Sequence, residues 1–317
     1  MIDVLLLAVG LVVLVKAADF LVEGASFIAS RSGIPPLVVG LTVVSFGTSM
    51  PEMLVTMTSG LRHNADLAIS NIVGSNIANV LLVLGIAAII RPLPVRDSTL
   101  VSEIPFSLTA ALLVGFLANA ALFSDYHELS ISQLDGSILL FFFFLFMLYV
   151  YKMARTNETA VPEVIVRGST IRALILISLG TVGLYFGGQW TVTGAIGLAQ
   201  SLNIDDAVIG LTIVAVGTSA PELMASAVAA YRNQTDIAVG NVVGSNIFNL
   251  LWVLGLTATV VELPFEVINN TDLVMVIVSS TLIVLALVAS RNMSVQRSHG
   301  ILFVLLYAAY LVYVIQR

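Results

Sequence analysis

Cysteine is absent from this chain of 317 residues, and charged residues make up only 10% of it. Without cysteine, neither a disulfide scaffold nor a thiolate metal site can form. A soluble globular protein is about one quarter charged, so this composition argues against a water-soluble domain. The three histidines, His63, His127 and His299, fall at the ends of apolar segments, which argues against a zinc or copper site with imidazole ligands.

Several functional motifs are also missing. The chain contains no P-loop, so we expect no nucleotide site and no ATP-driven pumping. It contains no His-Glu-x-x-His zinc motif and no Ser/His or Asp/Asp constellation of a hydrolase, so we expect neither enzyme activity nor a cofactor. Its formal net charge of −6 comes without a basic face, which argues against nucleic acid as a partner.

What the chain has in abundance is apolar sequence. Hydrophobic residues make up 58% of it, and its mean hydropathy is +1.04. A helix that crosses a bilayer needs about 20 mostly apolar residues. Ten segments meet this requirement: 3–30, 36–61, 67–90, 99–121, 131–151, 170–200, 207–231, 237–260, 272–290 and 299–315. The sequence therefore predicts an all-α polytopic membrane protein with ten transmembrane helices, and the first of them is read as a span rather than a cleavable signal.

The basic residues are distributed unevenly among the predicted loops. With ten spans, both chain ends lie on one side of the membrane, and only Arg62 and Arg317 of the 13 Lys and Arg residues share that side. Ten lie on the opposite side: Arg31, Arg91, Arg96, Lys152, Arg155, Arg167, Arg172, Arg232, Arg291 and Arg297. Because Lys and Arg favour cytoplasmic loops, we expect both termini outside and the connecting loop 154–169 in the cytoplasm.

The chain contains one long internal repeat. Residues 40–85 align without a gap with residues 210–255, and 23 of the 46 aligned positions are identical. Each half of the chain contains five predicted spans, an odd number, so the second copy enters the membrane in the opposite orientation. The sequence thus predicts two inverted-topology five-helix repeats, 1–153 and 170–317, of the kind that supports alternating access around a midplane site.

Each copy places one glutamate near the middle of a predicted span. Glu52 and Glu222 end the shared motif Gly-Thr-Ser-x-Pro-Glu. A carboxylate at that depth is costly unless it faces protein or water, so it indicates a functional site; a protonated glutamate that only stabilises helix packing is the alternative. Pro51 and Pro221 in the motif predict a kink with freed backbone carbonyls beside a cavity, a side chain or an ion.

Polar residues recur every four positions in the next span of each copy. They are Asn71, Ser75 and Asn79 in the first copy and Asn241, Ser245 and Asn249 in the second. On a helix this spacing places them on one face, where they serve either as ligands or as hydrogen-bonding contacts between helices. With the glutamates they form an all-oxygen set, which suits hard cations such as calcium and sodium.

Both copies resemble the alpha repeats of the calcium/cation antiporter superfamily and are most similar to prokaryotic sodium/calcium exchangers. The resemblance covers nearly the whole chain and is carried by the paired GTS-x-PE and GSN motifs. It implies location in a prokaryotic cytoplasmic membrane, and a metal-ion site with the carboxylates of two glutamates. The implied ligands are Glu52, Glu222, Thr48, Thr218, Ser75, Ser245, Asn79 and Asn249, with the carbonyls of Ser45 and Ala215.

These observations favour a secondary active antiporter that exchanges calcium for sodium by alternating access, with the first and sixth spans sliding against the others. The partners are then the two ions and the lipid bilayer, and the oligomeric state is left open. A proton/calcium antiporter on the same scaffold is the alternative, and a buried, self-contained site argues against a channel. Asp19 and Glu23, one helical turn apart near Lys16, are expected to form a local charge pair or line a rim rather than bind the ion.

Overall fold

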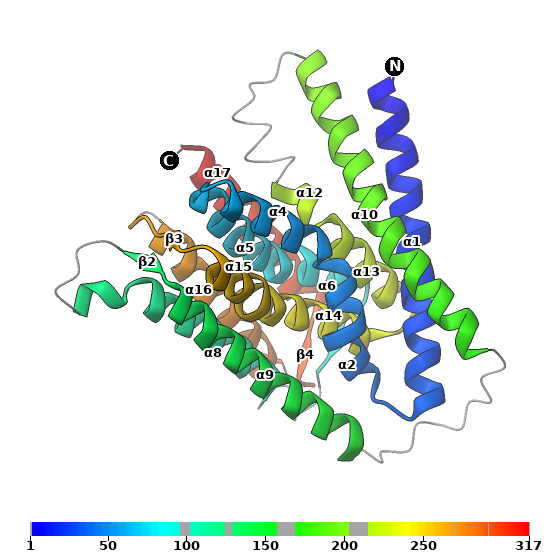
Figure 1. Ribbon diagram of the computed structural model, residues 1–317. Coiled ribbons are helices and arrows are strands. Elements are labelled where there is room, and N and C mark those ends of the chain that lie inside the picture. Colours follow the sequence, from blue (N-terminus) through cyan, green and yellow to red (C-terminus); the bar gives the residue numbers. More distant parts are fainter. Residues whose placement is uncertain are drawn as a thin grey trace.

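The computed structural model describes residues 2–95, 102–123, 129–156, 169–202, 215–267, 269–290 and 292–316. Within these ranges the chain is almost entirely helical (Figure 1). Several features named above lie outside the described residues: most of the connecting loop (157–168), the start of the second motif copy (210–214), and Arg96, Arg167, Arg291 and Arg317.

Seven helical segments among the described residues are long and apolar enough to cross a membrane. They are α1 (Ile2–Ser32), the run from α5 (Ala65–Ala78) to α6 (Gly85–Ile90), α9 (Gln133–Thr156), α10 (Thr170–Ser201), the run from α14 (Thr235–Ile247) to α15 (Leu254–Val260), α16 (Asn269–Ala289) and α17 (Arg297–Gln316). The protein is therefore an all-helical polytopic membrane protein.

The other three predicted spans differ from simple long helices. The span predicted at 36–61 is broken into α2 (Pro36–Val39), a π-helical turn, α3 (Ser45–Thr48) and α4 (Met50–Leu61), with a bend of 49° between α3 and α4. The span predicted at 99–121 contains α8 (Glu103–Ala118), which is short at 16 residues. The span predicted at 207–231 is described only from α12 (Ala215–Thr218) and α13 (Ala220–Tyr231) onward. The count of ten spans thus stays a prediction.

The helices with the polar stripes occupy the centre of the bundle. For each segment we compare the buried share of its most apolar 18 residues. The share is 78% in segment 65–90 and 94% in segment 235–260, but only 28% in α1. Figure 1 shows α5 and α14 enclosed by the other helices. Ser75 and Asn76 of α5 and Asn241, Ser245 and Asn246 of α14 are buried and therefore face protein rather than lipid, which removes the cost of exposing them to hydrocarbon.

Helices α1 and α10 pack against each other along one edge of the bundle (Figure 1). They approach at backbone distance, because a Cβ atom added to Gly10 would lie 2.5 Å from Thr191 Oγ1, and one added to Gly180 would lie 2.7 Å from the Leu21 nitrogen. Small residues permit such close packing where apolar burial from lipid offers little driving force. The two helices form one tightly fitted antiparallel pair.

Two short antiparallel ladders, which the all-α prediction did not include, join loops of the two halves. Strand β1 (Leu93–Pro94) pairs with β4 (Ser294–Val295), with Leu93 opposite Val295. Strand β2 (Ser130–Ile131) pairs with β3 (Leu263–Pro264), with Ile131 opposite Leu263. Each ladder therefore closes one helix-connecting region of the first half against one of the second.

Candidate cation site

Two helix breaks hold the glutamates. The chain bends at Ser49, and Glu52 follows in the first turn of α4; Glu222 has the same place in α13, after α12. Proline is harmless there, because the first amides of a helix have no intrahelical acceptor. The partial positive charge at a helix N-terminus also favours a carboxylate. The predicted kink is confirmed in the first copy, and the break makes each glutamate an N-terminal residue of a half-helix.

Both glutamates are fully buried and incompletely hydrogen-bonded. Glu52 and Glu222 are each 0% exposed. Neither oxygen of Glu52 has a hydrogen-bond partner among the described residues, whereas Glu222 accepts one bond, 3.1 Å from Ser49 Oγ, and leaves its Oε2 without one. Ser49 lies three residues before Glu52 and bonds to Glu222, so the two helix breaks meet in the protein interior. An arrangement of this kind requires a cation or protons to offset the burial of charge.

The hydroxyl groups of the predicted ligand set differ in their surroundings. Thr48 Oγ1 donates to Asn241 Oδ1 at 3.1 Å and lies 3.4 Å from Ser245 Oγ, so the end of α3 is bonded directly to α14. Ser75 is 2% exposed, and its hydroxyl has no hydrogen-bond partner in the described part of the chain. Thr218 ends α12 and is half-buried.

Two buried asparagines have side-chain oxygens that accept no hydrogen bond from the described residues. Asn79 and Asn249 are 0% exposed. The Nδ2 group of Asn79 donates to Asn246 Oδ1 at 3.1 Å, and that of Asn249 donates to Asn76 Oδ1 at 3.2 Å. The Oδ1 atom of each has no hydrogen-bond partner among the described residues. Amide oxygens left in this state are suitable ligands for a hard cation.

The two carbonyls in the predicted ligand set are less exposed to a ligand. The Ser45 carbonyl accepts the Ser49 amide at 3.0 Å and the Thr48 hydroxyl at 3.3 Å. The Thr48 hydroxyl has only one proton to share between this carbonyl and Asn241 Oδ1; when that proton is on Asn241, the second lone pair of the Ser45 carbonyl is open to an ion. Ala215 is the first residue of α12, and its side chain lies outside the described residues.

The polar stripe divides into two kinds of residue. Asn71 Nδ2 donates to the Glu52 carbonyl at 3.3 Å, and Asn241 Nδ2 donates to the Glu222 carbonyl at 3.4 Å. These two asparagines act as contacts between helices, the alternative that their spacing left open. The serines and asparagines one and two turns further along the stripe are buried, and of their side-chain oxygens Oγ of Ser75 and Oδ1 of Asn79 and Asn249 have no hydrogen-bond partner among the described residues.

Sequence reasoning missed two serines and two asparagines in this region. Ser49 bonds to Glu222, and Ser219 is 0% exposed, with a hydroxyl that has no hydrogen-bond partner among the residues that the structure describes. Asn76 and Asn246 hold the amide groups of the predicted asparagine ligands. All four are identical between the two copies, and that identity was the available signal.

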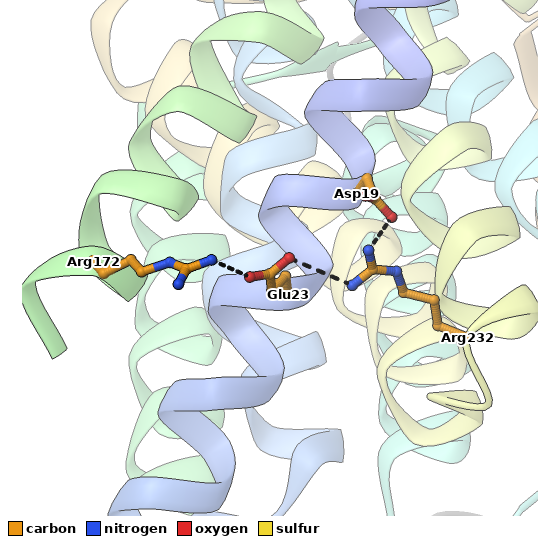
Figure 2. Close-up of polar contacts among 4 residues, drawn as sticks. All are labelled: Asp19, Glu23, Arg172 and Arg232. Atoms are coloured by element: carbon orange, nitrogen blue, oxygen red, sulfur yellow. Dashed lines mark hydrogen bonds and ion pairs between the residues drawn. The ribbon is translucent and has the colours of Figure 1, made fainter. Parts of the chain in front are cut away.

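The acidic pair of α1 lies in an ion-pair cluster. Asp19 Oδ1 is 2.5 Å from Arg232 Nη2, and Glu23 is 3.8 Å from Arg232 and 3.2 Å from Arg172 (Figure 2). Arg232 follows α13 and Arg172 lies on α10, so the cluster connects three helices. The expected charge pair is therefore present, but its partners are these two arginines, from distant parts of the chain, rather than Lys16.

Comparison with known proteins identifies the family of this chain. A family model described as sodium/calcium exchanger protein matches residues 2–152 and 172–316. The chain belongs to the sodium/calcium exchanger family. This confirms the resemblance carried by the paired motifs and makes the protein a membrane antiporter.

Individual relatives extend over most of this exchanger. Inner membrane protein YrbG of Escherichia coli (strain K12) is 37% identical over 264 residues, which cover 80% of this chain and 79% of that protein. Sodium/calcium exchanger MaX1 of Methanosarcina acetivorans is 30% identical over 344 aligned positions, covering 98% of both. The solved structure of the sodium-calcium exchanger NCX_Mj, soaked with 10 mM Na+ and zero Ca2+, superposes with a TM-score of 0.83 at 32% identity and 98% coverage of both chains.

Proposed function

We propose that this exchanger carries calcium and sodium alternately in one cage formed by the two copies of the core motif. The observation that carries the proposal is a group of buried oxygen atoms without a hydrogen-bond partner in the described residues. They are both carboxylate oxygens of Glu52, Oε2 of Glu222, Oδ1 of Asn79 and Asn249, and Oγ of Ser75 and Ser219. Such atoms are costly to bury, and a hard cation would satisfy them together.

The charge of the cage explains exchange without covalent chemistry. Two ionised glutamates carry two negative charges, which one Ca2+ neutralises; several Na+ ions can also occupy the site. In the part of the chain that the structure describes, no three His, Asp or Glu side chains lie together so that they could hold a metal ion. Neutral oxygens would therefore complete the coordination, and the hydroxyls of Thr48, Thr218 and Ser245 with the carbonyls of Ser45 and Ala215 fill out the proposed ligand set.

The contacts between the halves support an inverted repeat, with units 1–153 and 170–317. Leu93 of the first half pairs with Val295 of the second, while its repeat counterpart, Leu263, pairs with Ile131 of the first. Gly85 likewise lies against Gly300, and its counterpart Gly255 lies against Gly136. A two-fold operation that exchanges the halves produces this reciprocal set of contacts, and such repeats underlie alternating access.

Alternating access requires one part of the protein to move past another. We assign this movement to α1 and α10, as the family resemblance implies. Their direct backbone contacts at Gly10 and Gly180 make the pair a single tightly packed unit, and the cage-bearing helices α5 and α14 are far more deeply enclosed. The pair would slide against this enclosed centre and expose the cage to one side of the membrane at a time.

We further propose ten spans with both termini outside. The chain contains no native cysteine, so single cysteines can be introduced without background labelling. A cysteine at either terminus should react with an impermeant maleimide in intact cells, whereas one beside Arg155 should react only after permeabilisation. The opposite labelling pattern would reverse the orientation while leaving the repeat intact.

Transport in proteoliposomes tests the exchange itself. Vesicles loaded with sodium should take up calcium-45 when sodium is diluted outside, and uptake should stop when the sodium gradient is collapsed. The alternative, a proton/calcium antiporter, predicts uptake driven by a pH gradient with no sodium present. Uptake that follows neither gradient would overturn both, and uptake in every ionic condition would indicate a channel.

A further inference from the structure

Asn76 and Asn246 form a reciprocal pair at the interface of the two motif copies. Asn76 Nδ2 donates to the Asn246 carbonyl at 3.2 Å, and Asn246 Nδ2 donates to the Asn76 carbonyl at 3.3 Å. Both residues are at most 2% exposed. The two asparagines occupy the same position in their copies. Each side-chain amide donates to the backbone carbonyl of the other residue.

The backbone explains why these two carbonyls can accept a hydrogen bond from another helix. Just beyond each asparagine the α-helix passes into a π-helical turn, Asn79–Leu84 after α5 and Phe248–Val253 after α14. A change from i→i+4 to i→i+5 bonding disturbs the helical ladder, and π-helical turns of this kind recur at functional sites. The carbonyls of Asn76 and Asn246 lie at this disturbance and receive a bond from across the interface.

The side-chain oxygens of the pair have a second task. Asn76 Oδ1 accepts the amide of Asn249, and Asn246 Oδ1 accepts the amide of Asn79. Each asparagine therefore uses both ends of its side chain, which accounts for two amides in the interior of apolar helices. If Asn249 or Asn79 turned its amide over, two acceptor oxygens would meet and an NH2 group would enter the cage.

We propose that Asn76 and Asn246 are positioning residues that lock the amides of Asn249 and Asn79 with their oxygens toward the transported cation. The assignment crosses the repeats: Asn76 of the first copy orients a ligand of the second, and Asn246 of the second orients a ligand of the first. It rests on the proposed function, because it presumes that Asn79 and Asn249 are ligands of the cage. Partners that orient metal ligands typically affect affinity by about 10-fold to 100-fold.

The crossed assignment predicts which residues are coupled. Asn76→Ala should raise the calcium concentration for half-maximal uptake by about 10-fold to 100-fold, with the maximal rate less affected. Asn249→Ala should raise it similarly, and the double variant should be little worse than either single one, because both remove the same oriented oxygen. A residue that only supports folding would instead lower the yield or the maximal rate.

Asn71→Ala is the matched control, since Asn71 is an asparagine of the same helix that bonds to the Glu52 carbonyl. Its effect should multiply with that of Asn249→Ala. The measurement is sodium-driven calcium-45 uptake into proteoliposomes over a range of calcium concentrations. If Asn76→Ala fails to purify as a monodisperse species, Asn76→Ser serves instead, because its hydroxyl is too short to reach Asn249.

The outcomes separate the two proposals. If the parent protein shows no sodium-driven uptake, the proposed function fails. If the parent exchanges but Asn76→Ala keeps the parent's half-saturating calcium concentration, the positioning role is refuted. Independent, multiplying effects of Asn76→Ala and Asn249→Ala would refute it as well, whereas non-additive effects in that pair alone would support it.

Discussion

The two copies of the core motif share the asparagine bonds to the glutamate carbonyls and differ in the bonds at their margins. At the centre, Asn71 and Asn241 bond to the carbonyls of Glu52 and Glu222 at 3.3 and 3.4 Å. At the margin, Arg232 of the second copy meets two carboxylates on α1. Its counterpart Arg62 has no such partner on α10, where the aligned residues are the uncharged Gln189 and Thr193.

Within the proposed mechanism, this contrast separates residues that bind the ion from residues that favour one access state over the other. A cage that opens alternately to each side must present similar ligands in both states, so its residues repeat. A preference for one state over the other can come only from residues that do not repeat. The ion pairs of Arg232 with Asp19 and Glu23 are one such difference, because they connect α1 to the end of α13 and have no counterpart at the aligned residues Gln189 and Thr193.

Neutralising the repeated carboxylates should have the largest effect. Glu52→Gln and Glu222→Gln keep the side-chain size but each removes half of the carboxylate charge of the cage. We expect each to reduce sodium-driven calcium-45 uptake to the level of protein-free vesicles, while insertion is eased if anything, because a buried charge is lost. Monodispersity before reconstitution is the control.

Unequal losses of calcium uptake in the two glutamate variants would show that the two motif copies do not contribute equally to the site. Normal uptake in either well-folded variant would contradict a shared cage. Loss in only one would indicate a one-sided site, and the bond from Ser49 to Glu222, which has no described equivalent at Glu52, would then be the first asymmetry to examine.

Changes at the paired amides should be smaller and again equal. Asn79→Asp and Asn249→Asp each keep an oxygen where the amide oxygen stood, so calcium uptake should persist in both. Asn79→Ala and Asn249→Ala remove that oxygen and should weaken calcium affinity by about 10-fold or more. Concentration-dependent calcium-45 uptake measures all four, and unchanged ion selectivity in Asn249→Ala would exclude the residue from the site.

The smallest effect should come from the two arginines at the margin, Arg232 and Arg62, and it should differ between them. A partly exposed ion pair contributes about 0.2–1 kcal/mol, so loss of the pair with Asp19 in Arg232→Ala should shift the balance between inward and outward states by about 1.4-fold to fivefold. Arg62→Ala should leave that balance as it is. Half-saturating calcium concentrations in right-side-out and inside-out vesicles report the balance.

Equal shifts from Arg232→Ala and Arg62→Ala would remove the proposed asymmetry. The effect of Arg232→Ala should also fade at high salt, because exposed charges are screened. An effect that persists in molar salt would indicate that packing around Arg232, rather than its ion pairs, is responsible.

The sequence by itself determined the membrane class, the repeat and the family, because apolar length and residue identity are local properties of the chain. The helix predicted at 170–200 is observed at Thr170–Ser201, and the Pro-Glu motif predicted the break that the structure has at Ser49. The central position of the polar stripes could also be expected, since three amides and hydroxyls on one face of each of two apolar helices are costly to expose to lipid.

Only the tertiary structure decided which polar residues meet. The stripe spacing treats Asn71, Ser75 and Asn79 alike, yet Asn71 bonds to a backbone carbonyl while the amide of Asn79 is held by Asn246 of the other copy. Asp19 and Glu23 pair with arginines far along the chain rather than with nearby Lys16. Periodicity places a side chain on a face of its own helix, but the donor or acceptor opposite it depends on how separate helices pack, and that information is not local.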